Sequence, residues 1–383
     1  MAEQHFYRQL PGESLDTTPP SLLSRLHLDP PLLITLLLLS GFGLWVLYSA
    51  ANADMAVTNK QSIRIGIGLG ALVLLAQVPP RVLRFWTPII YAGGLILLLL
   101  VLVAGTEIKG AQRWLSIPGL GRFQPAELLK LAAPAMVAWY FHERHLPARL
   151  KDVFIALSIV ALPSLLIALQ PDLGTALLVA AGGLIALFIA GLSWRLILLT
   201  ASLIAVAAPL AYYFVLHDYQ RRRVDTFINP EADPLGAGWN IIQSKTAIGS
   251  GGLTGKGWFE GTQSRLDFLP ESSTDFIFAV LGEEFGFLGF LVLLACYLTI
   301  VLRSLLISYQ AQDTFGRLLS ASIGLTFFVY VIVNIGMVTG LLPVVGVPLP
   351  LVSYGGTSII TLLAGFGVLM SIHTHRKLHI HSR

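Results

Sequence analysis

The chain has 383 residues, of which 55% are hydrophobic and only 12% are charged, with a formal net charge of +4. A soluble globular domain carries about 25% charged residues, so this composition excludes a water-soluble protein and predicts a polytopic membrane protein. The long apolar runs exclude a transmembrane β-barrel, whose strands alternate apolar and polar residues over about ten positions. The single cysteine, Cys296, excludes an intramolecular disulfide.

A polar, proline-containing stretch of about 30 residues precedes the first apolar segment and lacks the apolar core of a cleavable signal peptide. A transmembrane helix needs about 20 apolar residues. Ten segments approach this length: residues 31–51, 62–79, 85–105, 125–142, 153–170, 174–192, 195–216, 275–302, 315–342 and 353–372. We expect an all-α bundle of about ten transmembrane helices over residues 31–372, with short tails at 1–30 and 373–383. One large loop, residues 217–275, separates the seventh and eighth helices.

The distribution of Lys and Arg sets the expected orientation. With the N-terminus inside, the short inside connections hold thirteen Lys and Arg residues, and the short outside connections hold five. Positive residues concentrate on the cytoplasmic side, so we expect both tails in the cytoplasm and the 217–275 loop outside. The same asymmetry accounts for the net charge, and no nucleic-acid partner is expected.

The first polar cluster leads into the fourth predicted helix. Arg113, Arg122 and Gln124 lie just before this helix. Glu127 and Lys130 follow in its first turns, three residues apart on one face, and can form an ion pair. A charge within a membrane helix costs about 2.5–3.5 kcal/mol on insertion scales. The pair is therefore a device that lets the helix insert, part of a functional site, or both.

The second cluster is the short connection Gln170–Thr175 (QPDLGT) between two apolar segments. Pro171 favours a turn, and Asp172 can cap the next helix by accepting from its first backbone N–H groups. For Asp172 alone, capping is the favoured interpretation.

The 217–275 loop contains a glycine-rich stretch, Gly249–Gly257. It does not match a phosphate-binding P-loop, because Ser250 occupies the first glycine position and Gly257 follows Lys256 where Ser or Thr is required. No nucleotide is therefore expected. Arg221 and its two arginine neighbours could contact lipid headgroups or a pyrophosphate, although a solvated collar at the membrane surface is slightly favoured.

The loop ends at Asp275, directly before an apolar run. A carboxylate at this boundary can meet water, lipid headgroups and a membrane-embedded substrate, so Asp275 is a functional candidate. Glu283 and Glu284 lie about 12 Å deeper along the same helix, and a structural role is favoured for both over a proton relay.

Proline and glycine are dense between Asn334 and Thr357 and should break the helix at membrane depth. Irregular backbone there is tolerated only where it is buried in protein or lines a wet cavity. We therefore expect a cavity near the outer leaflet, walled by this segment, by the 217–275 loop and by residues 110–130.

Five motifs occur in one order along the chain: Gly110–Trp114 (GAQRW), Phe123–Glu127 (FQPAE), Gln170–Thr175 (QPDLGT), Thr274–Phe278 (TDFIF) and Pro348–Gly356 (PLPLVSYGG). Together they resemble the SEDS family (shape, elongation, division and sporulation) of cell-wall proteins, over residues 27–377. His217–Arg221 (HDYQR), Asn334–Met337 (NIGM) and His373–Lys377 (HTHRK) are similar to its RodA-like, elongation branch. The chain departs from the family at Ala126, where Ser is frequent, and at Ser272 and Ser273, where a basic residue and His are frequent.

The resemblance implies a peptidoglycan glycosyltransferase that polymerises lipid II into glycan strands during cell elongation and rod-shape maintenance, releasing undecaprenyl pyrophosphate. It places the family's essential acid at Asp275 and its ion pair at Glu127 and Lys130. The candidate contacts to substrate and pyrophosphate are Arg113, Arg122, Gln124, Asp172, Arg221, Lys245 and Ser353.

Two roles for Asp275 are open. A carboxylate can accept the proton of an acceptor sugar hydroxyl as it attacks the anomeric carbon. Alternatively, Asp275 binds a divalent cation, Mg²⁺ or Mn²⁺, that stabilises the leaving pyrophosphate.

A lipid II flippase is the alternative function, although the chain shows no inverted repeat. A non-catalytic scaffold is a third possibility. The resemblance further implies a multi-pass protein of the bacterial plasma (inner) membrane. Its implied partners are a class B penicillin-binding protein transpeptidase and other elongation-complex proteins.

Overall fold

The computed structural model describes residues 26–108, 111–117, 121–214, 221, 225, 237–265 and 271–375. Its long helices are α2 (Pro30–Ala50), α3 (Met55–Ala76), α4 (Pro80–Ala104), α5 (Pro125–Phe141), α6 (Leu150–Ala168), α7 (Leu173–Ile189), α8 (Trp194–Phe214), α12 (Ile277–Tyr309), α13 (Thr314–Val338) and α14 (Thr357–Thr374). Each of the ten predicted apolar segments coincides with one of these helices. Six of them, α2, α4, α6, α12, α13 and α14, are long and apolar enough to cross a membrane.

Aspartates cap several helix starts. Asp29, Asp54, Asp172 and Asp313 each accept a hydrogen bond from a backbone N–H in the first turn of the helix that follows, namely α2, α3, α7 and α13. Such side-chain bonds satisfy N–H groups that have no partner within the helix. The capping interpretation of Asp172 is therefore confirmed.

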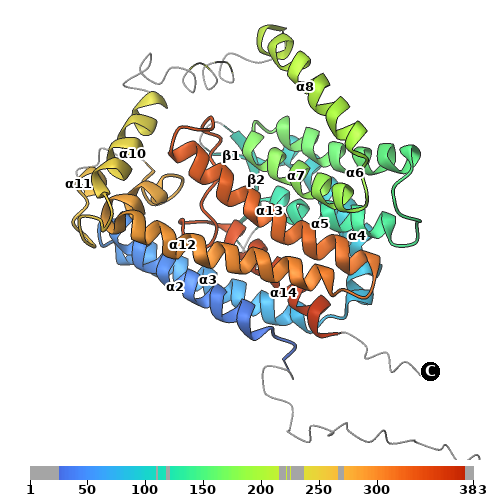
Figure 1. Ribbon diagram of the computed structural model, residues 1–383, viewed down its shortest axis with the longest axis horizontal. Helices are drawn as coiled ribbons and strands as arrows, with labels where there is room; N and C mark the ends of the chain where they lie inside the picture. Colours follow the sequence, from blue (N-terminus) through green and yellow to red (C-terminus); the bar gives the residue numbers. More distant parts are fainter. Residues whose placement is uncertain are drawn as a thin grey trace, which may run out of the picture.

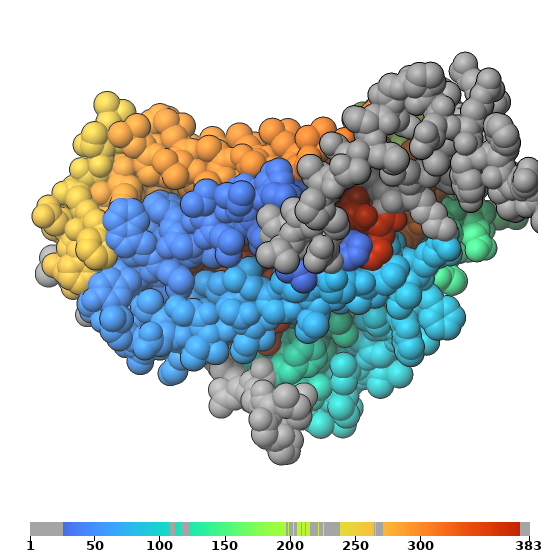
Figure 2. Space-filling model, turned by 90° about the horizontal axis from the view of Figure 1, so that it is seen from below, coloured from blue at the N-terminus to red at the C-terminus, as the bar shows by residue number. Residues whose placement is uncertain are grey.

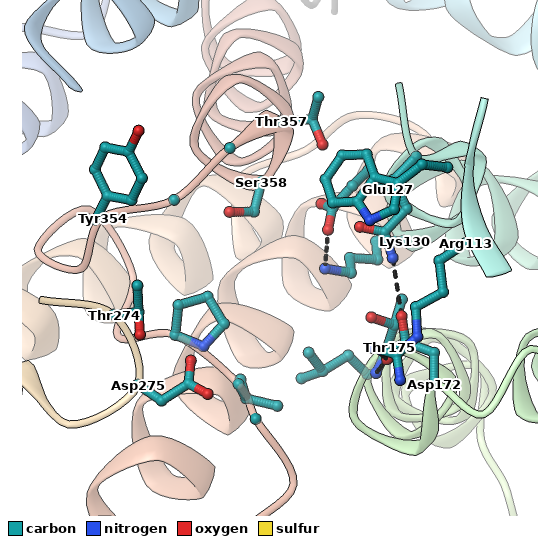
Figure 3. Close-up of a pocket in the computed structure, with 18 of the residues that line it drawn as sticks. Arg113, Glu127, Lys130, Asp172, Thr175, Thr274, Asp275, Tyr354, Thr357 and Ser358 are labelled. Atoms are coloured by element: carbon teal, nitrogen blue, oxygen red, sulfur yellow. Dashed lines mark hydrogen bonds and ion pairs between the residues drawn. The ribbon is translucent and has the colours of Figure 1, made fainter. Parts of the chain in front are cut away.

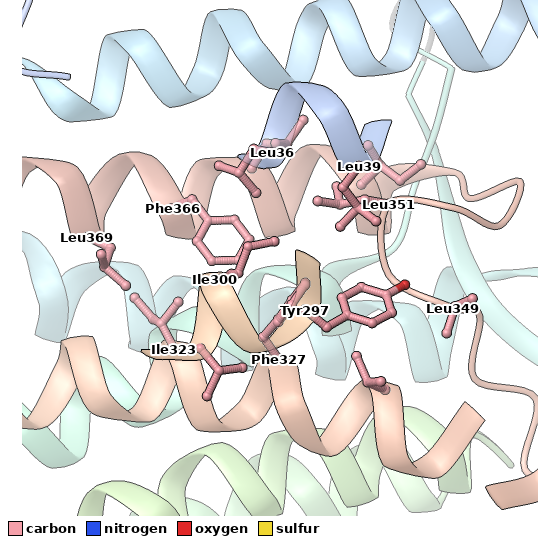
Figure 4. Packing of buried hydrophobic residues seen from close by; sticks show 14 of the residues in the cluster. Leu36, Leu39, Tyr297, Ile300, Ile323, Phe327, Leu349, Leu351, Phe366 and Leu369 are labelled. Carbon is pink, nitrogen blue, oxygen red and sulfur yellow. The ribbon is translucent and has the colours of Figure 1, made fainter. Parts of the chain in front are cut away.

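Helix α13 lies at the centre of the bundle. It packs against α12, α7 and α5, while α3 packs against α14 and α2 against α12. Figures 1 and 2 show α2 and α3 side by side along one face, and Figure 1 shows α8 extending away from the bundle. Aromatic and branched side chains fill the interior, where Phe327 lies edge-on to both Tyr297 and Phe366 (Figure 4).

Two regions expected to be connections contain regular structure. A small antiparallel sheet, β1 (Thr106–Ile108), β2 (Ala111–Ile117) and β3 (Gly121–Phe123), precedes α5. Within the 217–275 loop, α10 (Ala237–Gly251) packs against α12, and the short α11 (Thr262–Arg265) follows. The N-terminal tail 1–25, residues 376–383 and most of 215–236 lie outside the described residues.

The glycine-rich stretch docks onto a break in α12. Gly286 has a φ of 61° and interrupts this helix. Around the break, the backbone N–H groups of Lys256 and Gly257 donate to the carbonyls of Glu283 and Glu284 at 3.0 and 3.1 Å. A Cβ on Gly255 would lie 2.0 Å from the carbonyl oxygen of Glu284. Glycine is required here because two backbones are in contact.

Candidate functional site

A polar pocket of about 380 Å³ lies where several motifs meet. Its walls are β2, the starts of α5 and α7, the segment before α12, and the irregular segment before α14 (Figure 3). The lining includes Arg113, Gln124, Glu127, Lys130, Asp172 and Asp275. The structure thus brings together six of the residues predicted from sequence, contributed by four separate parts of the chain.

The ion pair predicted in α5 is present at the pocket wall. Nζ of Lys130 donates to Oε1 of Glu127 at 2.7 Å, and both side chains are almost fully buried. Pro125 at the first turn and Gln124 at the N-cap start α5 so that this pair faces the pocket. A buried pair of this kind is strongly coupled, because removing one partner leaves the other charge buried alone.

A second polar group links β2 to the start of α7. The side-chain amide of Gln124 donates to Oδ2 of Asp172 at 2.8 Å, and Nη1 of Arg113 lies 3.7 Å from Oδ1. Arg113 also donates to the backbone carbonyls of Gln170 and Pro171. Asp172 therefore caps α7 and orients two other pocket side chains at the same time.

Asp275 lies on the opposite side of the pocket from Glu127 and Lys130 (Figure 3). The side-chain amide of Asn334 in α13 donates to the carbonyl of Asp275 at 2.9 Å and to that of Val347 at 2.7 Å. The hydroxyl of Ser353 donates to the carbonyl of Thr274. The predicted break before α14 is present, and these bonds join it to the end of the 217–275 loop.

Helix α3 supports the same segment from behind. The side-chain amide of Gln61 donates to the carbonyl of Ser353 at 2.9 Å. The guanidinium of Arg64 stacks on the ring of Tyr354 at 4.5 Å and donates to the carbonyl of Gly355. The pocket wall that carries Tyr354 is therefore fixed by side chains from α3.

Three predicted contact residues lie elsewhere. Ser353 is buried and its hydroxyl joins two backbone segments. Arg221 donates to the carbonyl of Tyr213 near the end of α8. Lys245, on α10, lies against Gly340. None of the three lines the polar pocket as far as the described side chains define it, and the side chain of Arg122 is outside the described set.

The pocket lining also contains residues that the sequence did not single out: Trp114, Thr175, Glu271, Thr274, Tyr354, Thr357 and Ser358. Most of them belong to or adjoin the motifs quoted above, and that proximity is the signal that could have found them. Glu271 is different, because no motif contains it and its φ of 58° is unusual for a glutamate.

The described residues hold no cluster of three or more His, Cys, Asp or Glu side chains that could bind a metal ion. The pocket lining nevertheless includes two carboxylates close in sequence, those of Asp275 and Glu271. Carboxylate oxygens are the ligands that Mg²⁺ and Mn²⁺ prefer. The donor chemistry of these two side chains suits such a cation, with a substrate and water as further ligands.

An apolar groove of about 280 Å³ lies near the polar pocket. It is lined almost entirely by hydrocarbon side chains from α3, α4, α5, α13 and α14, including Leu75, Ile90, Leu131, Leu319 and Val368. The two sites together can accept a molecule with a polar head and a long apolar tail.

Glu283 and Glu284 have the structural roles that were favoured. The carboxylate of Glu283, fully buried, accepts from Nζ of Lys256 at 2.7 Å and from backbone N–H groups of Thr262 and Gln263. Ser49 of α2 donates to Glu284. The two acids attach the loop and α2 to α12.

The FtsW/RodA/SpoVE family of cell cycle proteins matches residues 30–378. The chain is 54% identical over 354 residues to the peptidoglycan glycosyltransferase MrdB of Escherichia coli K12, covering 92% of this chain and 95% of that protein. It is 40% identical over 365 residues to a probable peptidoglycan glycosyltransferase FtsW of Trichlorobacter lovleyi, with 91% and 94% covered.

Solved structures of related proteins support the same family assignment. A chain from a peptidoglycan synthase complex that coordinates polymerization and crosslinking has a TM-score of 0.80 at 34% identity, covering 90% of this chain and 97% of that one. The rod shape determining protein RodA of Thermus thermophilus has a TM-score of 0.68 at 31% identity, with 90% and 96% covered. The chain therefore belongs to the FtsW/RodA/SpoVE family of cell cycle proteins.

Proposed function

We propose that this protein is a peptidoglycan glycosyltransferase that polymerises lipid II during cell elongation and releases undecaprenyl pyrophosphate. The observation that carries the proposal is the polar pocket itself, in which Asp275 faces the Glu127–Lys130 pair. The 54% identity to a named peptidoglycan glycosyltransferase supports the same reaction.

The pocket and groove suit a lipid-linked sugar. The sugar and pyrophosphate occupy the polar pocket, and the prenyl tail lies in the apolar groove. Burying a prenyl chain contributes about 0.8 kcal/mol per CH₂-sized group, whereas the polar side chains orient the reacting end. The tail thus supplies affinity and the pocket supplies specificity.

Asp275 is the proposed general base. It accepts the proton of the acceptor sugar hydroxyl while that oxygen attacks the anomeric carbon of the donor. The bond from that carbon to the pyrophosphate oxygen breaks, and undecaprenyl pyrophosphate leaves with the bonding electron pair. Lys130 and Arg113 are placed to offset negative charge on the leaving group, with Glu127 and Asp172 orienting them.

A divalent cation is the alternative to the general-base role of Asp275. The pocket lining supplies the carboxylates of Asp275 and Glu271, whose oxygens suit such an ion. In this alternative, Mg²⁺ or Mn²⁺ held by Asp275 and Glu271 would stabilise negative charge on the leaving pyrophosphate.

The proposed setting is the bacterial plasma (inner) membrane, with both termini in the cytoplasm and the pocket opening to the outer leaflet. The positive-inside distribution of Lys and Arg supports this orientation. A class B penicillin-binding protein is the proposed partner, because a similar chain is part of a complex that couples polymerization to crosslinking. Other elongation-complex proteins would join them.

The test is polymerisation of lipid II by the purified protein in detergent, with Asp275→Asn as the variant. A general base contributes about 10²- to 10⁴-fold, so the variant should lose at least about 100-fold in rate. The exposed acid Glu143 provides a matched control, Glu143→Gln, which should polymerise at the wild-type rate. Wild-type polymerisation by Asp275→Asn would refute the assignment. Lipid II transfer across vesicles without polymer would favour a flippase instead.

A further inference from the structure

A small side cavity lies behind the Glu127–Lys130 pair. It shares these two residues with the polar pocket, and it shares Leu131, Ile323 and Thr361 with the apolar groove. The cavity therefore lies between the two larger sites. Its apolar wall includes Phe327, part of the packed core in Figure 4.

The cavity is lined by buried polar atoms without partners. Oε2 of Glu127 and Oγ1 of Thr326 have no hydrogen-bond partner among the described residues, and the hydroxyl of Tyr330 lies within reach of Lys130. All three residues are more than nine-tenths buried. Leaving two such atoms unsatisfied around one cavity would be costly, whereas buried water commonly satisfies groups of this kind.

The backbone of α5 adds a further acceptor. Pro134 has no N–H, so it cannot bond to the carbonyl of Lys130 one turn earlier. A Cβ on Gly182 of α7 would lie 3.2 Å from Oγ1 of Thr326 and 3.8 Å from that carbonyl oxygen. The two oxygens therefore face the same part of the interface between α5, α7 and α13.

The volume is sufficient for water. The centre of a water molecule can occupy about 30 Å³ of this cavity. One buried water needs about 10–15 Å³ on this measure and two to four polar partners. The cavity therefore has room for roughly two waters, and its polar atoms can hold them.

Tyr330 connects this cavity to the ion pair. Thr326 and Tyr330 are four residues apart on α13, so they lie on the same helix face. Nζ of Lys130 lies 5.1 Å from the centre of the Tyr330 ring, a distance that allows a cation–π interaction. The ammonium is thus held between a carboxylate and an aromatic ring.

We infer that the side cavity is an internal water site, and that Tyr330 with this water is the positioning element that directs Lys130 toward the polar pocket. Tyr330 does not line the polar pocket within the described residues, so it acts through Lys130 rather than on substrate. The water site stands on geometry alone, whereas its catalytic consequence rests on the proposed function.

The water site is tested without any assay of activity. Brief X-ray radiolysis generates hydroxyl radicals at bound water, and mass spectrometry then locates the oxidised side chains. Tyr330 and Tyr297 are equally buried, but the Tyr297 hydroxyl donates to the carbonyl of Pro350, and Tyr297 does not line the side cavity. We expect Tyr330 to be labelled at least about threefold faster. Equal labelling of the two tyrosines would overturn the water site.

The positioning role is tested with Tyr330→Phe, which keeps the ring and removes the hydroxyl. Loss of one hydrogen bond should lower kcat about three- to tenfold with KM within about twofold. Tyr91→Phe is the matched control, since Tyr91 is also buried and its hydroxyl bonds to Ile159 away from the pocket. Unchanged kcat in Tyr330→Phe, with Asp275→Asn inactive, would refute the inference and leave the proposed function intact.

If Tyr330→Phe does not fold, Thr326→Val serves as the second variant. It has nearly the same volume and loses only the hydroxyl that faces the cavity. Radiolytic labelling of Tyr330 should then fall by about half or more. Labelling at the wild-type rate would show that Thr326 holds no water.

Discussion

The tether between Asn334 and Asp275 offers a sharp test of how the pocket is built. Asn334 is fully buried on α13, and its side-chain amide donates to the carbonyls of Asp275 and Val347 at 2.9 and 2.7 Å. One side chain therefore holds together two walls of the pocket. Asn334→Ala removes both donors at once.

The expected loss of stability follows from the burial of the two acceptors. Val347 is only 2% exposed, so its carbonyl would stay unsatisfied at a cost of about 1–3 kcal/mol. The Asp275 carbonyl borders the pocket, where water can replace the amide, so its cost is about 1 kcal/mol. We expect a total of about 2–4 kcal/mol. A displacement of about 1 Å in a reacting group can cost about 100-fold in rate, so kcat should fall about 10- to 100-fold.

The assay combines thermal unfolding in detergent with lipid II polymerisation, scored per folded molecule. Ser244→Ala is the control. Ser244 of α10 is also fully buried, and its hydroxyl donates at 2.7 Å to the carbonyl of Val338, which lies on α13 as Asn334 does. It should lose about 1 kcal/mol and keep its kcat. If Asn334→Ala keeps wild-type kcat while its stability falls, the position of Asp275 does not depend on the tether.

Three further outcomes are expected. Glu127→Leu alone should destabilise the protein by about 3–5 kcal/mol. Adding Lys130→Met should restore most of the unfolding midpoint but should not restore polymerisation. Additive losses of stability in the double variant would contradict a coupled pair. Glu283→Ala removes the acceptor for donors in residues 256–263, so limited proteolysis should cut this segment faster, and unchanged cleavage would contradict the anchor. Burial and a neighbouring imidazole lower the pKa of His27 from its ordinary 6.5, so the folded state resists its protonation. The part of the unfolding free energy that depends on neutral His27 is present above pH 6.5 and should be lost as the pH falls through the lowered pKa. His27→Gln should flatten this pH dependence of stability in unfolding scans.

The charged part of the site could be predicted because membranes make charge expensive. Glu127, Lys130 and Asp275 stand out in apolar surroundings, and all three reach one pocket. The positions of the long helices follow from the same apolar contrast. Asp172 was assigned as a cap, and it caps α7 while also contacting Gln124.

The neutral part of the site could not be predicted in the same way. A hydroxyl such as that of Ser353 has the same sequence signature whether it contacts a substrate or joins two backbone segments. Strands β1 to β3 are three to seven residues long and, within the described part of the chain, pair only with one another, so no apolar alternation marks them. The side cavity depends on how α5, α7 and α13 approach one another, which local patterns do not encode.

The docking of the glycine-rich stretch onto α12 has a consequence for how the protein is made. The break at Gly286 exposes backbone groups that residues 252–257 complete, with Phe287 and Leu288 donating to the carbonyls of Gly252 and Leu253 at 3.0 Å. Until residues 252–257 dock onto it, the start of α12 carries unsatisfied backbone groups that lipid cannot solvate. This loop is therefore a poor place for an epitope tag or a protease site. Insertion of α12 into the bilayer and closure of the loop should occur as one event during biogenesis.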